Sequence, residues 1–166
     1  MKAPNGNPTN LNERQWLQVR TKNFINWFGD WINDPANASK VVDENSEPLV
    51  VYHGSDVNFS VFDINKVGKN YSRSNESTRY HKPAFYFTPW IEDDGTVAYG
   101  TGVVYKVFLN IRNPLLVNRV KSSNANDLQN YTDGVLNING VDSDEIVVFN
   151  PNQIKSATDN NGEFSD

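Results

Sequence analysis

Four aromatic residues near the start of the chain recur at helical spacing, at positions i, i+3, i+4 and i+7. They are Phe24, Trp27, Phe28 and Trp31. This spacing predicts one buried stripe of an α-helix. Thr21 is placed to cap the start of the helix, and Gly29 or Asn33 is placed to end it.

The residues before this stripe divide into two parts. Residues 1–10 are mostly Asn, Pro, Gly and Thr, so we expect a flexible N-terminus. A shorter helix is expected around residues 12–19, with Trp16 and Leu17 facing inward. Three of the 4 tryptophans lie in this helical region, which favours a helical layer packed against a sheet.

After residue 48 the periodicity changes to that of β-strands. Short apolar or alternating runs predict eight strands. Their ranges are 49–53, 59–62, 84–88, 103–110, 115–118, 135–138, 145–149 and 153–156. Helices followed by many strands favour an α+β fold over alternating βαβ units. We expect a single domain over residues 11–157 and a flexible C-terminus over residues 158–166.

Composition narrows the class of protein. Aromatic residues make up 12% of the 166 residues, which argues for a folded chain. The net charge of −5 lowers the expectation of a DNA-packaging role, and the absence of cysteine excludes thiolate chemistry and disulfides. Neither a GxGxxG nor a P-loop motif is present. Without a long apolar segment or an apparent export signal, we expect a cytoplasmic protein that does not bind membranes, and delivery into a host cell stays open. We also expect a monomer.

Three short motifs could carry chemistry, and each also has a structural explanation. His53 ends an apolar strand directly before Gly54, where a ligand can approach the backbone, although such a histidine can simply cap the strand. Tyr86 alternates with two phenylalanines in a strand and can be an ordinary half-buried residue. Glu145 opens an apolar strand, where a carboxylate is common but could also stabilise a developing cation. His81, flanked by polar residues, is expected in a solvated loop.

The order of these motifs resembles the His-Tyr-Glu class of ADP-ribosyltransferases, which includes diphtheria toxin and the poly(ADP-ribose) polymerases. His-Gly-Ser comes first, Phe-Tyr-Phe-Thr second, and Glu-Ile-Val-Val-Phe-Asn-Pro-Asn-Gln-Ile third. With the helical lead before them, they are most similar to the ADP-ribosyltransferase-like domain of phage and mobile-element polyvalent proteins. The likeness runs from about residue 16 to residue 157. It implies a split, strongly bent, antiparallel-rich pair of β-sheets behind the N-terminal helices.

The resemblance also implies a role for each residue in the motifs. His53 would bond the adenosine-side ribose of NAD, and the Gly54 backbone would hold the nicotinamide carboxamide. Tyr86 would pack on the nicotinamide ring, with Tyr99 closing its other face. Glu145 would be the catalytic carboxylate that bonds the 2′-hydroxyl of the nicotinamide ribose. NAD is then a co-substrate, and no metal is expected.

The leading hypothesis is therefore an NAD-dependent mono-ADP-ribosyltransferase of phage or bacterial origin, toxin-like, that releases nicotinamide. Residues 118–144 would face the acceptor, a protein or nucleic acid that the sequence does not identify. Some relatives bond the carboxamide with a serine after the tyrosine strand, where this chain offers only Thr96. Two other hypotheses stay open: a non-catalytic NAD- or ADP-ribose-binding module, and a toxin-like RNase or interaction domain.

Overall fold

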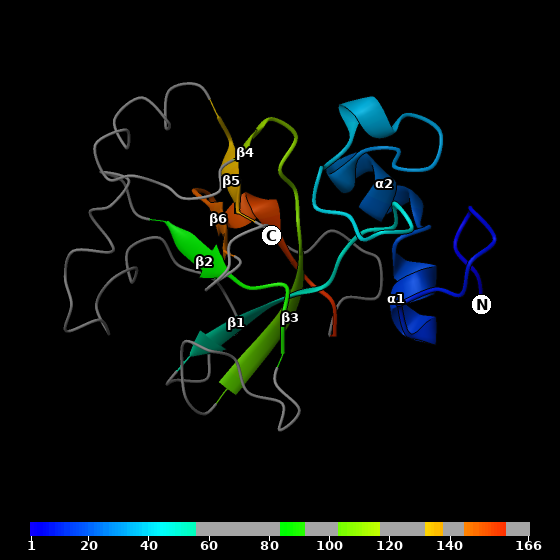
Figure 1. Cartoon of the computed structure of the whole chain (residues 1–166), viewed down its shortest axis with the longest axis horizontal. Coiled ribbons are helices and arrows are strands. Elements are labelled where there is room, and N and C mark those ends of the chain that lie inside the picture. The colour runs from blue at the N-terminus through cyan, green and yellow to red at the C-terminus, as the bar shows by residue number, and fades with distance from the viewer. Residues whose placement is uncertain (56–83, 92–102, 117–131, 138–144, 159–166) are drawn as a thin grey trace.

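The computed structural model describes residues 1–55, 84–91, 103–116, 132–137 and 145–158. Within these ranges the chain forms two α-helices and seven strands (Figure 1). The elements are α1 (Glu13–Gln18), α2 (Lys22–Phe28), β1 (Val51–Ser55), β2 (Phe85–Phe87), β3 (Val103–Leu109), β4 (Pro114–Leu116), β5 (Gly134–Asn137), β6 (Glu145–Val148) and β7 (Ile154–Ser156). Two short 3₁₀ helices, η1 (Pro35–Asn37) and η4 (Pro151–Gln153), join them.

The ends of α2 follow the sequence signals. The Thr21 hydroxyl accepts a hydrogen bond from the Phe24 amide at 3.3 Å and so caps the helix. The helix ends at Gly29, which has a φ of 101°. Trp31 lies beyond the helix but is buried, and its indole nitrogen donates to the carbonyl of Val19 at 2.9 Å. The predicted aromatic stripe is confirmed as a buried cluster, although its last member lies outside the helix.

The first helix differs from its prediction in the face that it buries. Leu17 is 55% exposed, so the expectation that it faces inward is wrong. The side chains of Gln15 and Gln18 are buried instead, and they donate to the carbonyls of Ala157 and Ser156 at 3.4 and 2.9 Å. The side-chain nitrogen of each glutamine finds a backbone acceptor at the C-terminal end of β7, whereas the buried Oε1 of Gln18 has no hydrogen-bond partner in the part of the chain that the structure describes. The helix thus buries polar side chains that a hydrophobic pattern does not mark.

The strands form two sheets. One has the order β1-β3-β7 and the other β2-β6-β5-β4. All pairings are antiparallel except that of β4 with β5, which is parallel. Seven of the eight predicted strands are confirmed to within two residues over the part of the chain that the structure describes, and the one predicted at 59–62 lies outside that part. The α+β fold class is confirmed.

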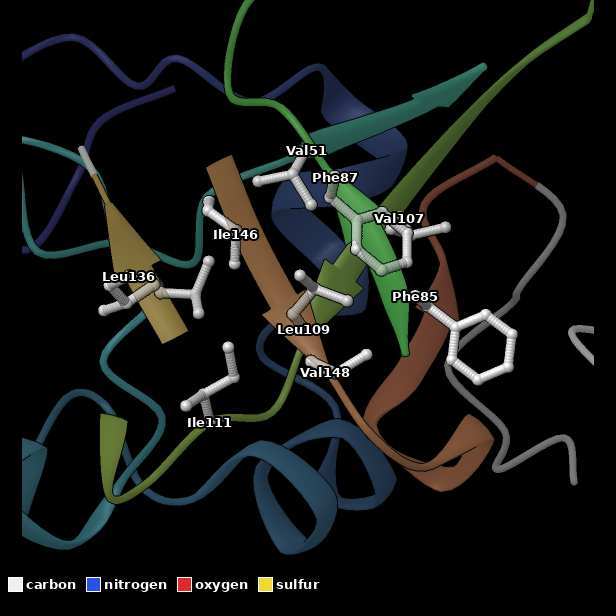
Figure 2. Packing of buried hydrophobic residues seen from close by; sticks show 10 residues of the cluster. Val51, Phe85, Phe87, Val107, Leu109, Ile111, Leu136, Ile146 and Val148 are labelled. Atoms are coloured by element: carbon white, nitrogen blue, oxygen red, sulfur yellow. The ribbon is translucent and has the colours of Figure 1, made fainter. Parts of the chain in front are cut away.

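Successive side chains of β3 point to opposite faces of its sheet and belong to two different apolar clusters. Val107 and Leu109 of β3 face the four-stranded sheet and pack with Phe85 and Phe87 of β2 (Figure 2). Phe108 points the other way and packs among the aromatic residues of α2. The three-stranded sheet is therefore covered by the helices on one face and by the second sheet on the other, which is visible in Figure 1.

The first ten residues form a turn that packs against a similar turn at residues 42–48. Isolated bridges close both turns, Lys2 with Pro8 and Val42 with Pro48. The Asn45 side chain donates to the carbonyl of Pro8 at 3.2 Å, and the Thr9 hydroxyl donates to the buried carboxylate of Glu47 at 2.6 Å. These contacts join the N-terminal residues to the segment that leads into β1. The flexibility and domain limits expected from the sequence stay predictions.

Candidate functional site

The two sheets meet where Tyr52 of β1 pairs with Thr88, the residue directly after β2. The Tyr52 amide donates to the Thr88 carbonyl at 2.8 Å, and the Thr88 amide donates to the Tyr52 carbonyl at 2.9 Å. In the part of the chain that the structure describes, this bridge is the only backbone pairing between the two strands. It fixes the histidine strand beside the tyrosine strand, so three candidate residues, His53, Gly54 and Tyr86, lie within two residues of one junction.

The side chain of His53 adds a further contact between β1 and β2. Its ring nitrogen Nδ1 lies 2.7 Å from the Tyr86 carbonyl oxygen. Since a carbonyl can only accept, Nδ1 carries the proton and donates it. The ring also packs against Phe87, with 5.4 Å between the ring centroids, and so faces the core between the sheets. The histidine is therefore held in one orientation by a polar and an aromatic contact.

The environment of His53 favours its neutral form. Burial lowers the pKa of the imidazole from its ordinary value of 6.5, and the hydrogen bond to Tyr86 offsets part of this effect. The lowered pKa makes the neutral ring the favoured form above pH 6.5. With the proton on Nδ1, the other ring nitrogen, Nε2, has a lone pair that can accept a hydrogen bond from a ligand hydroxyl.

The Gly54 backbone points toward the side of β1 that faces β2. Backbone groups of successive residues in an antiparallel ladder point to alternate sides. Tyr52 directs its N–H and C=O to β2, so Gly54, two residues later, directs its own to the same side. A continued ladder would place Tyr86 opposite Gly54, but the Tyr86 carbonyl accepts from His53 instead. The Gly54 amide and carbonyl thus point to the side of β1 on which β2 lies.

Tyr86 and Glu145 lie on one face of the four-stranded sheet. Tyr86 pairs with Val147 across β2 and β6, and Glu145 is two residues before Val147. Residues two apart in a strand share a face, so Glu145 is a diagonal neighbour of Tyr86. Both side chains are half-buried, and Tyr86 packs against the small cluster around Val147. An aromatic residue and a carboxylate therefore share this face as diagonal neighbours.

The motif after Glu145 anchors the strand that carries it. Gln153 accepts from the amides of Phe149 and Asn150 at 3.1 and 3.0 Å. Its side-chain nitrogen donates to the carbonyls of Asn110 and Asp133 at 3.0 and 2.7 Å. One glutamine thus joins the end of β6 to the ends of β3 and β5. The Asn-Pro-Asn-Gln motif therefore has a structural role, because its glutamine fixes the end of β6 and so the position of Glu145 in the sheet.

The candidate residues do not all share one surface. The His53 ring faces the core between the sheets, whereas Tyr86 and Glu145 occupy the opposite face of the four-stranded sheet. The Tyr86 carbonyl, at the edge of β2, is where the two sides meet. Tyr99, together with His81 and Thr96, lies outside the described residues.

Sequence reasoning assigned no role to one residue of this region, Thr88. It is two residues after Tyr86 and therefore on the same face, a signal that the strand period contains. In the described ranges no group of three or more acidic or histidine side chains is arranged to hold a metal ion. None of the helices described there is long and apolar enough to cross a membrane.

Two sheets joined at a His-Gly strand and a Tyr strand, behind N-terminal helices, define an α+β domain of the ADP-ribosyltransferase type. Residues 43–139 match the family model described as ADP-ribosyltransferase in polyvalent proteins. This match covers more than half of the chain, which belongs to that family. It includes His53, Gly54, Tyr86 and Tyr99 and ends before Glu145. No curated protein and no solved structure matches the chain.

Proposed function

We propose that this domain is an NAD-dependent mono-ADP-ribosyltransferase. In the proposed reaction the bond between C1′ of the ribose and the nicotinamide nitrogen breaks, and its electron pair leaves with neutral nicotinamide. A nucleophile of the acceptor then bonds C1′ and loses its proton. Family membership supports the ADP-ribosyl chemistry. The use of NAD, the release of nicotinamide and a macromolecular acceptor are the parts of the proposal that experiments must test.

The hydrogen bond from His53 to the Tyr86 carbonyl is the observation that supports this proposal best. It connects two motifs that lie 33 positions apart in the chain. The register of β2 with β6 adds Glu145 as a diagonal neighbour of Tyr86. A dinucleotide that crosses the edge of β2 would reach all three residues.

In this arrangement His53 would accept a ribose hydroxyl through Nε2, and Gly54 would bond the nicotinamide carboxamide through its N–H and C=O. Tyr86 would pack on the nicotinamide ring. Offset stacking of aromatic rings contributes roughly 0.5–1.5 kcal/mol beyond the buried area. Tyr99 remains a predicted second aromatic contact.

Glu145 would supply the rate acceleration. Loss of nicotinamide leaves positive charge on the ribose, as in glycoside hydrolysis. A carboxylate fixed beside that charge stabilises the transition state more than the ground state, which is the condition for catalysis. Its half-buried position at the start of β6 reduces screening by water and strengthens the effect.

Nicotinamide release from NAD tests this function. Glu145→Gln preserves shape and removes charge, so it should lower the release rate about 100-fold or more. Glu13→Gln changes an exposed carboxylate at the start of α1 and should leave the rate unchanged. Equal release by the Glu145→Gln variant would contradict the catalytic role.

The same assay, combined with calorimetry, distinguishes the proposed enzyme from a non-catalytic NAD-binding module. A binding module would take up NAD in calorimetry and release no nicotinamide in either protein. Absence of any NAD binding would contradict both forms of the proposal. With turnover established, labelled NAD and a host lysate, split between protease and nuclease treatment, would identify the chemical class of the acceptor.

A further inference from the structure

We infer that Thr88 is a ligand-binding residue that donates a hydrogen bond to the ribose hydroxyl held by Glu145. This inference rests on the proposed function and adds a donor to the same site. It assigns a role to a residue that sequence reasoning passed over. Three observations carry it: the register of Thr88, the hydrogen bonds that fix it, and the proton of its hydroxyl.

Thr88 lies opposite Glu145 when the register of the two strands is continued by one residue. The last pair of the ladder joins Phe87 to Ile146, so the next position pairs Thr88 with Glu145. Thr88 directly follows β2, two residues after Tyr86, so the strand period continued by one residue places both on the face of Glu145. Tyrosine, threonine and glutamate therefore form one group on this face of the sheet.

The backbone of Thr88 is fixed by two hydrogen bonds to one residue of β1. Its amide and carbonyl form the bridge to Tyr52 at 2.9 and 2.8 Å. A β-branched side chain has few rotamers on a fixed backbone, so the hydroxyl is pre-oriented. A pre-oriented donor loses little conformational entropy when a ligand binds.

The hydroxyl of Thr88 has a proton to give. Its oxygen accepts from the Trp90 amide at 3.3 Å, which uses one of its two lone pairs. None of the residues that the structure describes accepts the hydroxyl proton. Thr88 is half-buried, so part of the residue is accessible from solvent.

The spacing suits a shared ribose hydroxyl. Directly opposite residues in an antiparallel pair have Cβ atoms roughly 4.5–5.5 Å apart. Two O–H···O bonds of roughly 2.7 Å each can meet at one oxygen placed between such residues. A ribose hydroxyl would donate to the Glu145 carboxylate and accept from Thr88. This arrangement orients the sugar so that its developing charge lies beside the carboxylate.

Calorimetry with two ligands tests this role. The ligands are NAD and an NAD analogue that lacks the 2′-hydroxyl of the nicotinamide ribose. Thr88→Val keeps the branched shape and removes the hydroxyl, and should raise the Kd for NAD about three- to tenfold. Thr88→Ser keeps the hydroxyl and should bind NAD within about twofold of the wild-type protein. For the analogue, the wild-type and valine proteins should bind equally.

The ratio of the two Kd values is measured within each protein, so it does not depend on a small loss of stability. If Thr88 only holds the Trp90 turn, the valine variant weakens NAD and the analogue alike, which would overturn this inference. Unchanged NAD binding by the valine variant would also overturn it. Both results leave the proposed function standing. Failure of the wild-type protein to bind NAD would remove the proposed function and this inference together.

Discussion

The imidazole of His53 donates a 2.7 Å hydrogen bond to the backbone carbonyl of Tyr86. The two residues belong to different sheets, so this bond is part of the junction between them. The position of the histidine therefore depends on the tyrosine strand. Conditions that change the charge of His53 should change both the stability of the junction and its affinity for a ligand.

Stability should depend on pH through His53. Burial lowers the pKa of His53 in the folded state from 6.5, so the unfolded state binds the proton more readily. The stability that the neutral ring contributes is complete above pH 6.5 and is lost as the pH falls from 6.5 through the folded pKa. Urea unfolding at pH 7.5 and pH 5.5 should show this loss in the wild-type protein.

The comparison variant for this measurement is His53→Gln, which cannot titrate. Its unfolding free energy should change less between the two pH values, because only carboxylates and His81 remain. Affinity for NAD should follow the same direction, falling as His53 is protonated and Nε2 ceases to accept. An identical pH dependence in the two proteins would contradict the account of this residue.

The two described glycines with positive φ allow a matched test of how closely the end of α2 packs against the segment around Ala38. Gly29 has a φ of 101°, and an added Cβ would lie 2.5 Å from the Cα of Ala38. Gly6 has a φ of 88°, and an added Cβ would meet nothing within 4 Å. Both alanine variants carry the conformational cost of a positive φ, roughly 1–3 kcal/mol.

Gly29→Ala carries an additional overpacking cost, roughly 1–3 kcal/mol, because the contact is with backbone that cannot easily move. Thermal and urea unfolding of the two variants should therefore rank Gly29→Ala well below Gly6→Ala. Equal stability of the two would mean that the helix α2 and the segment around Ala38 are less closely packed than described.

The sequence predicts some parts of this structure better than others. Local sequence patterns predict the aromatic stripe around α2, the threonine that caps this helix, and seven of the strands. Leu17 was misassigned because α1 is only 6 residues long, too short for its apolar positions to fix which face is buried. What decides that face is the pairing of Gln15 and Gln18 with β7, which lies more than a hundred positions away.

The site shows the same division. Motif order indicates which residues belong together, but the pairing of Tyr52 with Thr88 depends on how two sheets dock, which no local pattern contains. The sequence places Thr88 in the predicted strand 84–88 but indicates no role for it. Its shared face with Tyr86 becomes informative only once the register with Glu145 is known.

The most direct test of the account is a crystal structure of the Glu145→Gln variant grown with NAD, because slow turnover should preserve the intact dinucleotide. We expect one NAD across the edge of β2, with nicotinamide on Tyr86 and its ribose between Thr88 and residue 145. A ribose hydroxyl should lie within hydrogen-bond distance of His53 Nε2. NAD bound away from β2, or density that leaves these residues without contact to it, would contradict the account.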